Sequence, residues 1–386
     1  MINNHGVSLT EKPQINLGLE GVYFMESKIC KVDGKAGKLY YYGYDIGELA
    51  AASNFEEISY LLLYGELPTT KQMKDFSSAL AEERNLDDRV INLIKGVPQE
   101  TNPMHTLSAA MDLIGAYDKS AENTSDNEST SIRIISKIAS VVAAIGSIRS
   151  SGKYTNPDPK LGHTANFLYM LNGEPKPKEV VKLADTMFLL HAEHSSNAST
   201  FSGIVTISTL SDIYSAVVSA INTLKGSLHG GADEAALKMI MSGVGKDPDK
   251  YIDGIISSGN RIMGFGHRVY KTYDPRAVII KEQLKAAIRN TDDRVKKIAD
   301  TAFMIEEAAI KRTGQKGIWP NVDFFSGPVY SYIGIEPELF TPVFALSRAP
   351  GWCSHIVEYL KNNRLIRPTV YYTGETGRPY KEINGR

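Results

Sequence analysis

The feature that most constrains the fold of this chain is the spacing of its apolar residues, which recur every three or four positions over long stretches. Four runs show this spacing clearly: Phe55–Tyr64, Val180–His194, Ser199–Leu224 and Ala232–Met241. Such spacing places the apolar side chains on one face of an α-helix, whereas a half-buried strand would alternate every second residue. We therefore predict a mainly α protein built from many packed helices.

A few segments depart from the helical pattern. Lys28–Val32 and Lys38–Tyr42 flank a turn rich in Asp and Gly, which predicts a small β hairpin near the N-terminus. Thr369–Tyr372 has the composition of another short strand. Loops between helices are predicted where polar residues, Gly and Pro gather, at Asp118–Ser131, Ser150–Lys160 and Gly173–Lys178.

Length and charge limit the class of protein. A chain of 386 residues exceeds the size at which one core usually stops growing, so about two domains are expected. Lys and Arg number 43 against 44 Asp and Glu, and this balance argues against a nucleic-acid partner. The longest apolar run, around Ile138–Ile148, falls short of the roughly 18 residues that span a bilayer. We expect no membrane association.

The N-terminus and the cysteines bear on the compartment. The first residues contain neither an apolar secretory segment nor an Arg-rich transit peptide. Cys30 and Cys353 are too few for a disulfide scaffold, and two unpaired thiols suit a reducing environment. We therefore expect a cytoplasmic protein.

Two histidines lie in Gly-rich turns rather than on helices. His229 lies within Lys225–Gly231, and His267 lies within Met263–Arg268. Glycines on either side let a ligand approach the backbone closely, so a histidine in such a turn is well placed to meet a substrate. The alternative is an incidental exposed histidine beside a turn glycine.

A carboxylate in an apolar segment is the third candidate. Asp323 follows a Pro-Asn turn and is flanked by Val322 and Phe324. Apolar surroundings raise the pKa of a carboxyl group and suit it to proton abstraction. Alternatively, Asp323 caps the helix that follows, a common use of Asp at such a position.

Arginines and a possible metal site complete the candidates. Arg276, Arg348 and Arg367 each stand next to a turn or a helix end, and if they converge they would bind a di- or tricarboxylate bidentately. Taken singly, each is better interpreted as a surface ion-pair partner. His191 and His194, with Glu193 between them, lack a further ligand at sensible spacing, so no metal site is predicted.

Together these fragments resemble the citrate synthase family. The strongest is Gly264–His267 followed by Asp274–Arg276, and the others occur in the family's order over nearly the whole chain: Tyr60–Thr69, His191–Thr200, Leu228–Ala232 and Pro320–Asp323. The resemblance implies an almost all-α homodimer whose subunit has two domains. A small domain at about residues 231–334 would be inserted in a large helical domain made of residues 1–230 and 335–386.

The resemblance also implies a reaction and a role for each candidate. Acetyl-CoA, oxaloacetate and water would give citrate and CoA, with acetyl-CoA as co-substrate and no separate cofactor. Asp323 would remove a methyl proton from acetyl-CoA, His229 would donate a hydrogen bond to the thioester oxygen, and His267 would polarise the ketone of oxaloacetate. The residues expected to hold oxaloacetate are His194, Arg276, Arg348 and, from the partner subunit, Arg367.

CoA itself would meet a loop of the small domain. The residues implied are the backbone of Arg261, Ile262, Met263, Gly264 and Phe265, with Lys271 at the phosphates.

Two positions depart from the family's common pattern, since Ser227 stands where Pro is usual and Asp233 where Asn is usual. If Asp233 faced His229, its charge would favour a protonated imidazole and weaken the expected role of a neutral donor.

Other activities remain open at this point. A 2-methylcitrate synthase, which uses propionyl-CoA, shares the same motifs, and one methylene is worth only about 1–3 kcal/mol in a pocket. A non-catalytic interaction protein of the same fold would be expected to have lost at least one of His229, His267 and Asp323. A citryl-CoA-cleaving enzyme usually carries further domains.

Overall fold

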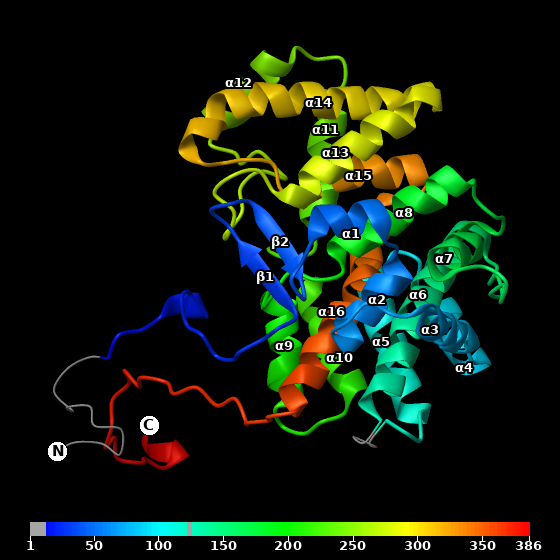
Figure 1. The fold of residues 1–386 in the computed structure, drawn as a ribbon. Coiled ribbons are helices and arrows are strands. Elements are labelled where there is room, and N and C mark those ends of the chain that lie inside the picture. The colour runs from blue at the N-terminus through cyan, green and yellow to red at the C-terminus, as the bar shows by residue number, and fades with distance from the viewer. Residues whose placement is uncertain (1–12, 122–125) are drawn as a thin grey trace. The chain divides into compact units, whose positions relative to one another are not determined.

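The computed structural model describes residues 13–121 and 126–386, and helices dominate it (Figure 1). The first helices of the described residues are α1 (Ile46–Ala52), α2 (Phe55–Tyr64), α3 (Thr70–Glu82), α4 (Asp88–Gly96), α5 (Pro103–Tyr117), α6 (Asn127–Ser151), α7 (His163–Asn172) and α8 (Lys178–His191). They are followed by α9 (Ala198–Ile207), α10 (Ile213–Leu224), α11 (Ala232–Gly243), α12 (Pro248–Ser257), α13 (Pro275–Ala287), α14 (Asp293–Thr313), α15 (Val322–Ile333) and α16 (Phe340–Leu360). Short 3₁₀ turns occur at Leu17–Leu19, Ile288–Asn290, Gly314–Lys316, Pro337–Leu339 and Ile383–Gly385. The mainly α prediction is confirmed.

One small antiparallel sheet accompanies the helices. Strands β1 (Cys30–Asp33) and β2 (Lys38–Tyr41) pair so that Cys30 faces Tyr41, and a two-residue strand, β3 (Tyr44–Asp45), pairs with β2. The predicted hairpin is therefore confirmed. The strand predicted at Thr369–Tyr372 is wrong, because in the described part of the chain this exposed segment pairs with no other strand.

Helix boundaries follow from local capping. The run Phe55–Tyr64 is a single helix, which begins after the side-chain cap Asn54 and ends at Gly65 in a left-handed conformation. The run Ser199–Leu224, predicted as one helix, is two. It breaks because Leu210 adopts a φ of 64° and Asp212 caps the start of α10.

The loop predictions hold with narrower limits. Asp126 caps α6 by accepting a hydrogen bond from the Ser129 backbone, so the second half of Asp118–Ser131 is helical. Residues 122–125 of that stretch lie outside the described residues. The other two loops separate α6 from α7 and α7 from α8, as expected.

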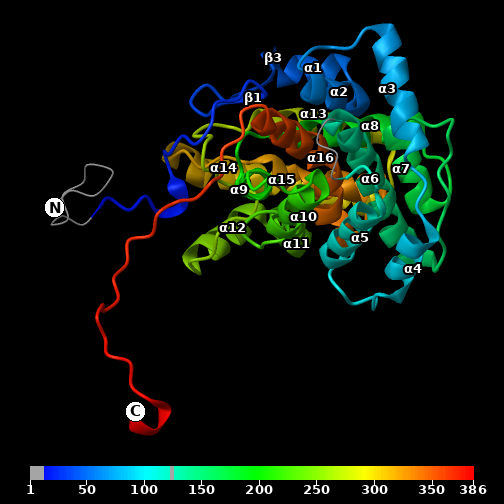
Figure 2. The same ribbon diagram turned by 90° about the horizontal axis from the view of Figure 1, so that it is seen from below.

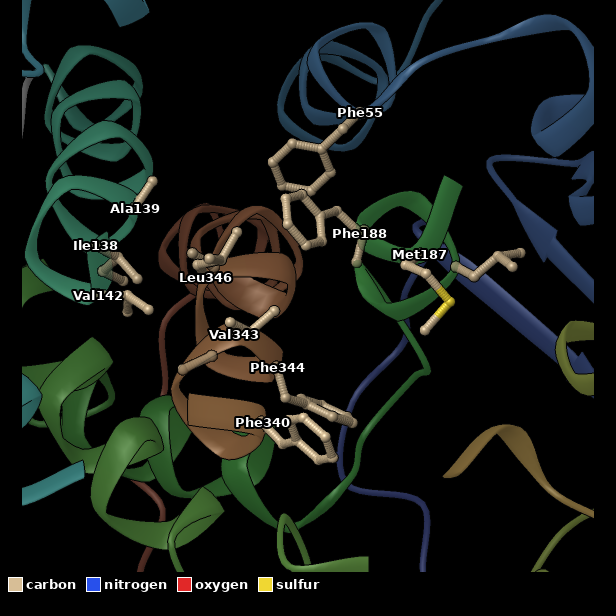
Figure 3. Packing of buried hydrophobic residues seen from close by; sticks show 14 of the residues in the cluster. Phe55, Ile138, Ala139, Val142, Met187, Phe188, Phe340, Val343, Phe344 and Leu346 are labelled. Atoms are coloured by element: carbon tan, nitrogen blue, oxygen red, sulfur yellow. The ribbon is translucent and has the colours of Figure 1, made fainter. Parts of the chain in front are cut away.

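Helix α16 forms the centre of the helical core, with α2, α5, α6, α8, α9 and α10 packed around it (Figure 2). Figure 3 shows Ile138 and Val142 of α6 next to Leu346 of α16. On another side, the rings of Phe55 in α2 and Phe188 in α8 meet edge to face at 5.8 Å. Because α16 is enclosed, its polar side chains are taken out of water and must find partners inside the protein.

Helix α6 carries the apolar run that was expected to be too short for a bilayer. Within the described residues it is the helix that, by length and composition alone, is long and apolar enough to cross a membrane. That expectation is corrected because the two serines of the run, Ser140 and Ser147, fit within a continuous helix of 25 residues. The apolar window is 78% buried inside the protein, as expected of a core helix.

The chain divides into two compact units, one formed by Ser27–Arg364 and the other by Met1–Glu26 with Leu365–Arg386. Within Ser27–Arg364, helices α11 to α15 gather at the upper end in Figure 1. Both boundaries predicted for a small domain, at about residues 231 and 334, fall within this unit, so the small domain stays a prediction. Cys30 and Cys353 are both free thiols.

Candidate active site

His229 lies in the turn between α10 and α11, and one of its ring nitrogens is hydrogen-bonded to Ser199. Its Nε2 lies 3.3 Å from the backbone nitrogen of Ser199 and 2.9 Å from Ser199 Oγ. A backbone N–H can only donate, so we assign Nε2 as the acceptor and place the proton of the neutral ring on Nδ1. Burial lowers the pKa of His229 to about 4, with Arg348 adding to the effect. The ring is therefore neutral at physiological pH and offers an Nδ1–H donor.

His267 has the opposite tautomer. Its Nδ1 accepts hydrogen bonds from the backbone nitrogens of Val269 at 3.0 Å and Tyr270 at 3.1 Å. The proton is therefore assigned to Nε2. Burial, and secondarily Arg276, lower the pKa of His267 to about 4. Neither histidine is an incidental exposed residue, since each is fixed by backbone groups and partly buried.

Asp323 is the second residue of α15, not its cap. The cap is Asn321, whose side-chain oxygen accepts a hydrogen bond from the Asp323 backbone, so the capping interpretation of Asp323 is wrong. No hydrogen bond to its carboxylate is formed within residues 13–121 and 126–386. Burial raises the pKa of Asp323 to about 6, while Arg276 acts in the opposite direction. Such a carboxylate is basic enough to take a proton near neutral pH.

The loop before α13 and the start of α15 are joined by backbone contacts. Asn321 donates from its backbone to the Gly264 carbonyl at 2.9 Å and from its side chain to the Gly266 carbonyl at 2.8 Å. Gly264 has a φ of 76°, and a Cβ there would come within 2.7 Å of Phe324. These contacts fix the segment that carries His267 against the helix that carries Asp323.

Two of the three candidate arginines are buried in the same region. Arg276 forms a bidentate ion pair with Asp274, at 3.1 and 2.7 Å, and its side chain is 3% exposed. Arg348 donates from Nε to the His191 carbonyl at 2.6 Å and forms no ion pair with any described residue. The surface ion-pair interpretation is therefore wrong for both. A buried guanidinium without a counter-ion is a site for an anionic ligand.

His194 completes this cluster. Its ring lies 5.1 Å from that of His267, centroid to centroid, and its Nε2 is 3.2 Å from the Tyr270 hydroxyl. Burial, followed by the charge of Arg276, holds the pKa of His194 well below its usual value. Asn321, beside Asp323, binds the Gly266 carbonyl in the His267 loop, and Trp352 of α16, the helix of Arg348, binds the Ser199 hydroxyl that contacts His229. The structure thus brings the predicted catalytic residues into one region, where the charges of Arg276 and Arg348 act on them.

The residues weighed as metal ligands are engaged elsewhere. His191 Nδ1 is 2.8 Å from the Met187 carbonyl, and Glu193 pairs with His355. Among the residues described, no three or more His, Cys, Asp or Glu side chains are grouped to hold a metal ion.

Asp233 does not raise the pKa of His229, on which burial and the charge of Arg348 act. It is buried in the first turn of α11, and burial, followed by the charge of Asp323, holds its pKa well above the usual range. A raised pKa favours the uncharged form of Asp233, which limits its influence on the charge of His229. Ser227 is exposed in the turn that precedes His229.

The residues predicted to bind CoA lie close together in the chain, at positions 261–265 and 271. Ile262 is 8% exposed, the ring of Phe265 packs edge to face on Phe324 at 5.1 Å, and Arg261 and Lys271 are exposed. Met263 is partly buried against the core. Arg367 is exposed and belongs to the unit formed by Met1–Glu26 and Leu365–Arg386, whereas the other candidates belong to the unit Ser27–Arg364.

Sequence reasoning missed several residues that hold the site together. Ser199 binds His229 and also accepts a hydrogen bond from Trp352 Nε1 at 3.1 Å, while Tyr270 contacts both His194 and His267. Ser199 lies within a motif fragment, but no pattern assigned it a role. Its function is visible only once α9, α16 and the His229 turn are brought together.

Known proteins match the chain over almost its whole length. A family model described as "Citrate synthase, C-terminal domain" matches residues 18–369. Citrate synthase of Haloferax volcanii is 43% identical over 381 residues, which are 97% of this chain and 99% of the relative. That of Deinococcus radiodurans is 41% identical over 373 residues, 96% and 98% of the two chains.

A solved structure agrees with these relatives. It is the ternary complex of citrate synthase from Thermoplasma acidophilum with carboxymethyl coenzyme A and oxaloacetate. That structure matches this one with a TM-score of 0.91 at 36% identity and covers 97% of this chain and 100% of its own. On sequence, fold and the geometry of its histidines, arginines and aspartate, the chain belongs to the citrate synthase family.

Proposed function

We propose that this enzyme condenses acetyl-CoA with oxaloacetate and hydrolyses the resulting thioester to citrate and CoA. One observation carries the proposal. Two histidines are held neutral, with their tautomers set by backbone N–H groups, beside an aspartate of raised pKa and two buried arginines. This set combines a base, two uncharged hydrogen-bond donors and an anion site.

The first step is removal of a methyl proton from acetyl-CoA. Asp323 accepts this proton, and the electron pair moves toward the thioester oxygen, where Nδ1–H of His229 meets it. A thioester methyl is a very weak acid, so a carboxylate alone is too slow. One pre-positioned donor of this kind is typically worth about 2.7–4 kcal/mol in the transition state. A neutral imidazole supplies it without needing a counter-anion.

The second step forms the carbon–carbon bond. The enol carbon attacks the ketone carbon of oxaloacetate, and negative charge develops on the ketone oxygen, where Nε2–H of His267 donates. Arg276, Arg348 and His194 hold the carboxylates of oxaloacetate and orient the ketone. Water then cleaves the thioester bond of the condensed product, which releases citrate and the CoA thiol.

Several further assignments belong to this proposal. CoA is bound by the backbone of Arg261–Phe265 and by Lys271, on a small domain of about residues 231–334 that closes over the substrates and excludes water until the bond has formed. Arg367 reaches oxaloacetate from the second subunit of a homodimer. The enzyme works in the cytoplasm, without a further cofactor.

The direct test is release of CoA thiol. Purified protein should release thiol from acetyl-CoA only when oxaloacetate is added, and no oxaloacetate-dependent release would contradict the proposal. Propionyl-CoA in a parallel assay separates the 2-methylcitrate synthase alternative, because a higher kcat/KM with propionyl-CoA would favour that activity.

The base has its own test. Asp323→Asn should lower turnover by about a hundred- to ten-thousandfold, the usual contribution of a general base. Oxaloacetate binding, measured by calorimetry, should be nearly unchanged, since Arg276 and Arg348 remain. Near-normal turnover would remove Asp323 from the role of base.

A further inference from the structure

A buried ion pair joins the turn that carries His194 to helix α16, which carries Arg348. His355 Nε2 lies 2.9 Å from Glu193 Oε1, and the two side chains are 3% and 0% exposed. Neither residue has a role in the reaction proposed above. An isolated buried carboxylate is costly in a protein interior, so its pairing calls for an explanation.

Helical spacing places this pair close to the arginine that binds substrate. Arg348, Gly351 and His355 are three and four residues apart, so they follow one face of α16. The turn containing Ala192 and Glu193 lies directly on that face. A Cβ at Gly351 would come within 2.3 Å of the Ala192 carbonyl oxygen and 2.3 Å of Glu193 Oε2.

The same turn is also held from the sheet. Tyr41 of β2 donates its hydroxyl hydrogen to the Glu193 carbonyl at 2.9 Å and accepts from the Glu193 backbone nitrogen at 3.2 Å. The backbone of Glu193 is thus fixed independently of its side chain. The side chain is free to serve another purpose than holding the turn in place.

The charges around Arg348 indicate that purpose. Burial lowers the pKa of Arg348, and Glu193 is the first of the charges that act on it, ahead of Arg276. Burial also lowers the pKa of His355, but Glu193 and then Glu358 outweigh this effect and raise it above its ordinary value. The raised pKa favours the protonated form of His355, and its buried 2.9 Å contact with Glu193 makes it the cation of the pair.

Glu358 stands on the outer side of this arrangement. Its Oε2 is 4.0 Å from His355 Nδ1, its side chain is 21% exposed, and its Oε1 accepts a hydrogen bond from the Lys28 backbone at 3.0 Å. Water screens its charge more than that of Glu193. Among the buried charges around Arg348, Arg276 is paired with Asp274 and Glu193 is paired with His355, so the negative charge of Glu193 is opposed by His355.

We infer that His355 neutralises Glu193, so that the charge of Arg348 stays available for a carboxylate of oxaloacetate. His355 touches no substrate and acts through Glu193 and Arg348, which makes it a positioning residue for the anion site. Without its positive charge, Glu193 would compete with the substrate for Arg348. The inference rests on the proposed function, in which Arg348 binds oxaloacetate.

Charge balance and simple packing predict different results in a set of three variants. His355→Gln keeps a hydrogen-bond donor toward Glu193 but leaves its charge unbalanced. The KM and the calorimetric Kd for oxaloacetate should then rise at least about tenfold at pH 8, with kcat and the KM for acetyl-CoA little changed. Glu193→Gln removes both charges, because His355 then loses its proton, and should leave oxaloacetate affinity within about threefold of the wild type.

The double variant Glu193→Gln/His355→Gln decides between the two explanations. It is uncharged like the original pair, so it should restore the affinity lost in His355→Gln. If the pair serves only packing, the double variant will bind oxaloacetate no better than His355→Gln, and that result would overturn the inference. A tenfold loss of affinity in Glu193→Gln alone would also overturn it, which keeps the test valid if His355→Gln does not fold.

A matched control is available at another buried histidine. His163 in α7 is 2% exposed, and burial lowers its pKa to about 4, so His163→Gln removes no charge. Its oxaloacetate affinity should equal that of the wild type. If the wild type itself neither binds oxaloacetate nor turns over, the proposed function fails. If the wild type does both and His355→Gln matches it, the charge-balance inference alone fails.

Discussion

Burial moves the ionisation of Asp323, His229 and His267 in the directions that their proposed roles require. The carboxyl group becomes a stronger base, with a pKa of about 6, and both imidazoles lose their protons at a pKa of about 4. Between these two values the histidines are already neutral while Asp323 is still protonated. Above pH 6 all three are in the form that the reaction needs.

This order of ionisation predicts the acid limb of the pH profile. As pH falls through about 6, Asp323 gains a proton and kcat/KM for acetyl-CoA should fall about tenfold per pH unit. Neither histidine should add a second step above pH 5. The measurement is kcat/KM between pH 5 and 9, and a profile that stays flat down to pH 5 would show that the pKa of Asp323 is not raised as described.

The same raised pKa makes Asp323 a cost to stability. Its folded-state pKa of about 6 exceeds the usual 3.8, so folding favours the protonated form and the ionised form opposes folding as pH rises through 6. Asp323→Asn should therefore raise the free energy of unfolding at pH 8 by about 1–3 kcal/mol. Urea unfolding at pH 8 and pH 4 measures this, and the gain should disappear at pH 4.

At the scale of elements, the site depends on how closely helix α16 approaches the turn between α8 and α9. Gly351 permits this approach because it has no Cβ, and Ser195 in the turn adopts a φ of 56°. This segment also carries His194, and the His191 carbonyl at its start accepts a hydrogen bond from Arg348. A single methyl group at the contact would displace several binding residues together.

Gly351→Ala should therefore weaken both stability and substrate binding. The added methyl overlaps backbone and carboxylate atoms, so we expect a loss of about 1–3 kcal/mol of unfolding free energy and a higher KM for oxaloacetate. Gly254→Ala in α12 is the matched control, because a Cβ there meets nothing within 4 Å. It should leave KM unchanged and stabilise the helix by up to about 1 kcal/mol. Equal stability of the two variants in urea would contradict the close contact.

Element boundaries also show what the sequence could and could not predict. Phe55–Tyr64 was predicted correctly because its cap and its terminal glycine are visible in the sequence. The break between α9 and α10 was missed because no Gly or Pro marks it, and the left-handed residue there is Leu210. The failed strand at Thr369–Tyr372 had suitable residues but no partner, which composition alone cannot supply.

The site was predictable where chemistry and motif coincide in one short segment. His229, His267, Asp323, Arg276 and Arg348 were all named from their local surroundings, and the structure brings them together. The raised pKa of Asp323 was predicted from its apolar neighbours, but the tautomers of His229 and His267 were not, because they depend on the backbone donors Ser199 N and Tyr270 N. The Glu193–His355 pair was missed because its members are far apart in the chain and form no motif.

At the scale of the whole molecule, the proposed contribution of Arg367 from a second subunit can be tested by complementation. Asp323→Asn and Arg367→Ala should each be nearly inactive. In a purified heterodimer of the two, one site would combine a normal Asp323 with a normal Arg367 from the partner, so about half of wild-type activity should return. Thiol release by a heterodimer isolated with two different affinity tags measures this. An inactive heterodimer would place Arg367 in the site of its own subunit.

The enclosure of helix α6 has a consequence for biosynthesis. The helix packs against α5, α7 and α16, and of these three helices α16 is the last to be synthesised. Until then the nascent chain exposes an apolar segment that is long enough to span a bilayer and is prone to aggregate. Chaperones that shield hydrophobic stretches during translation are therefore expected to matter more for the yield of this protein than for its stability once folded.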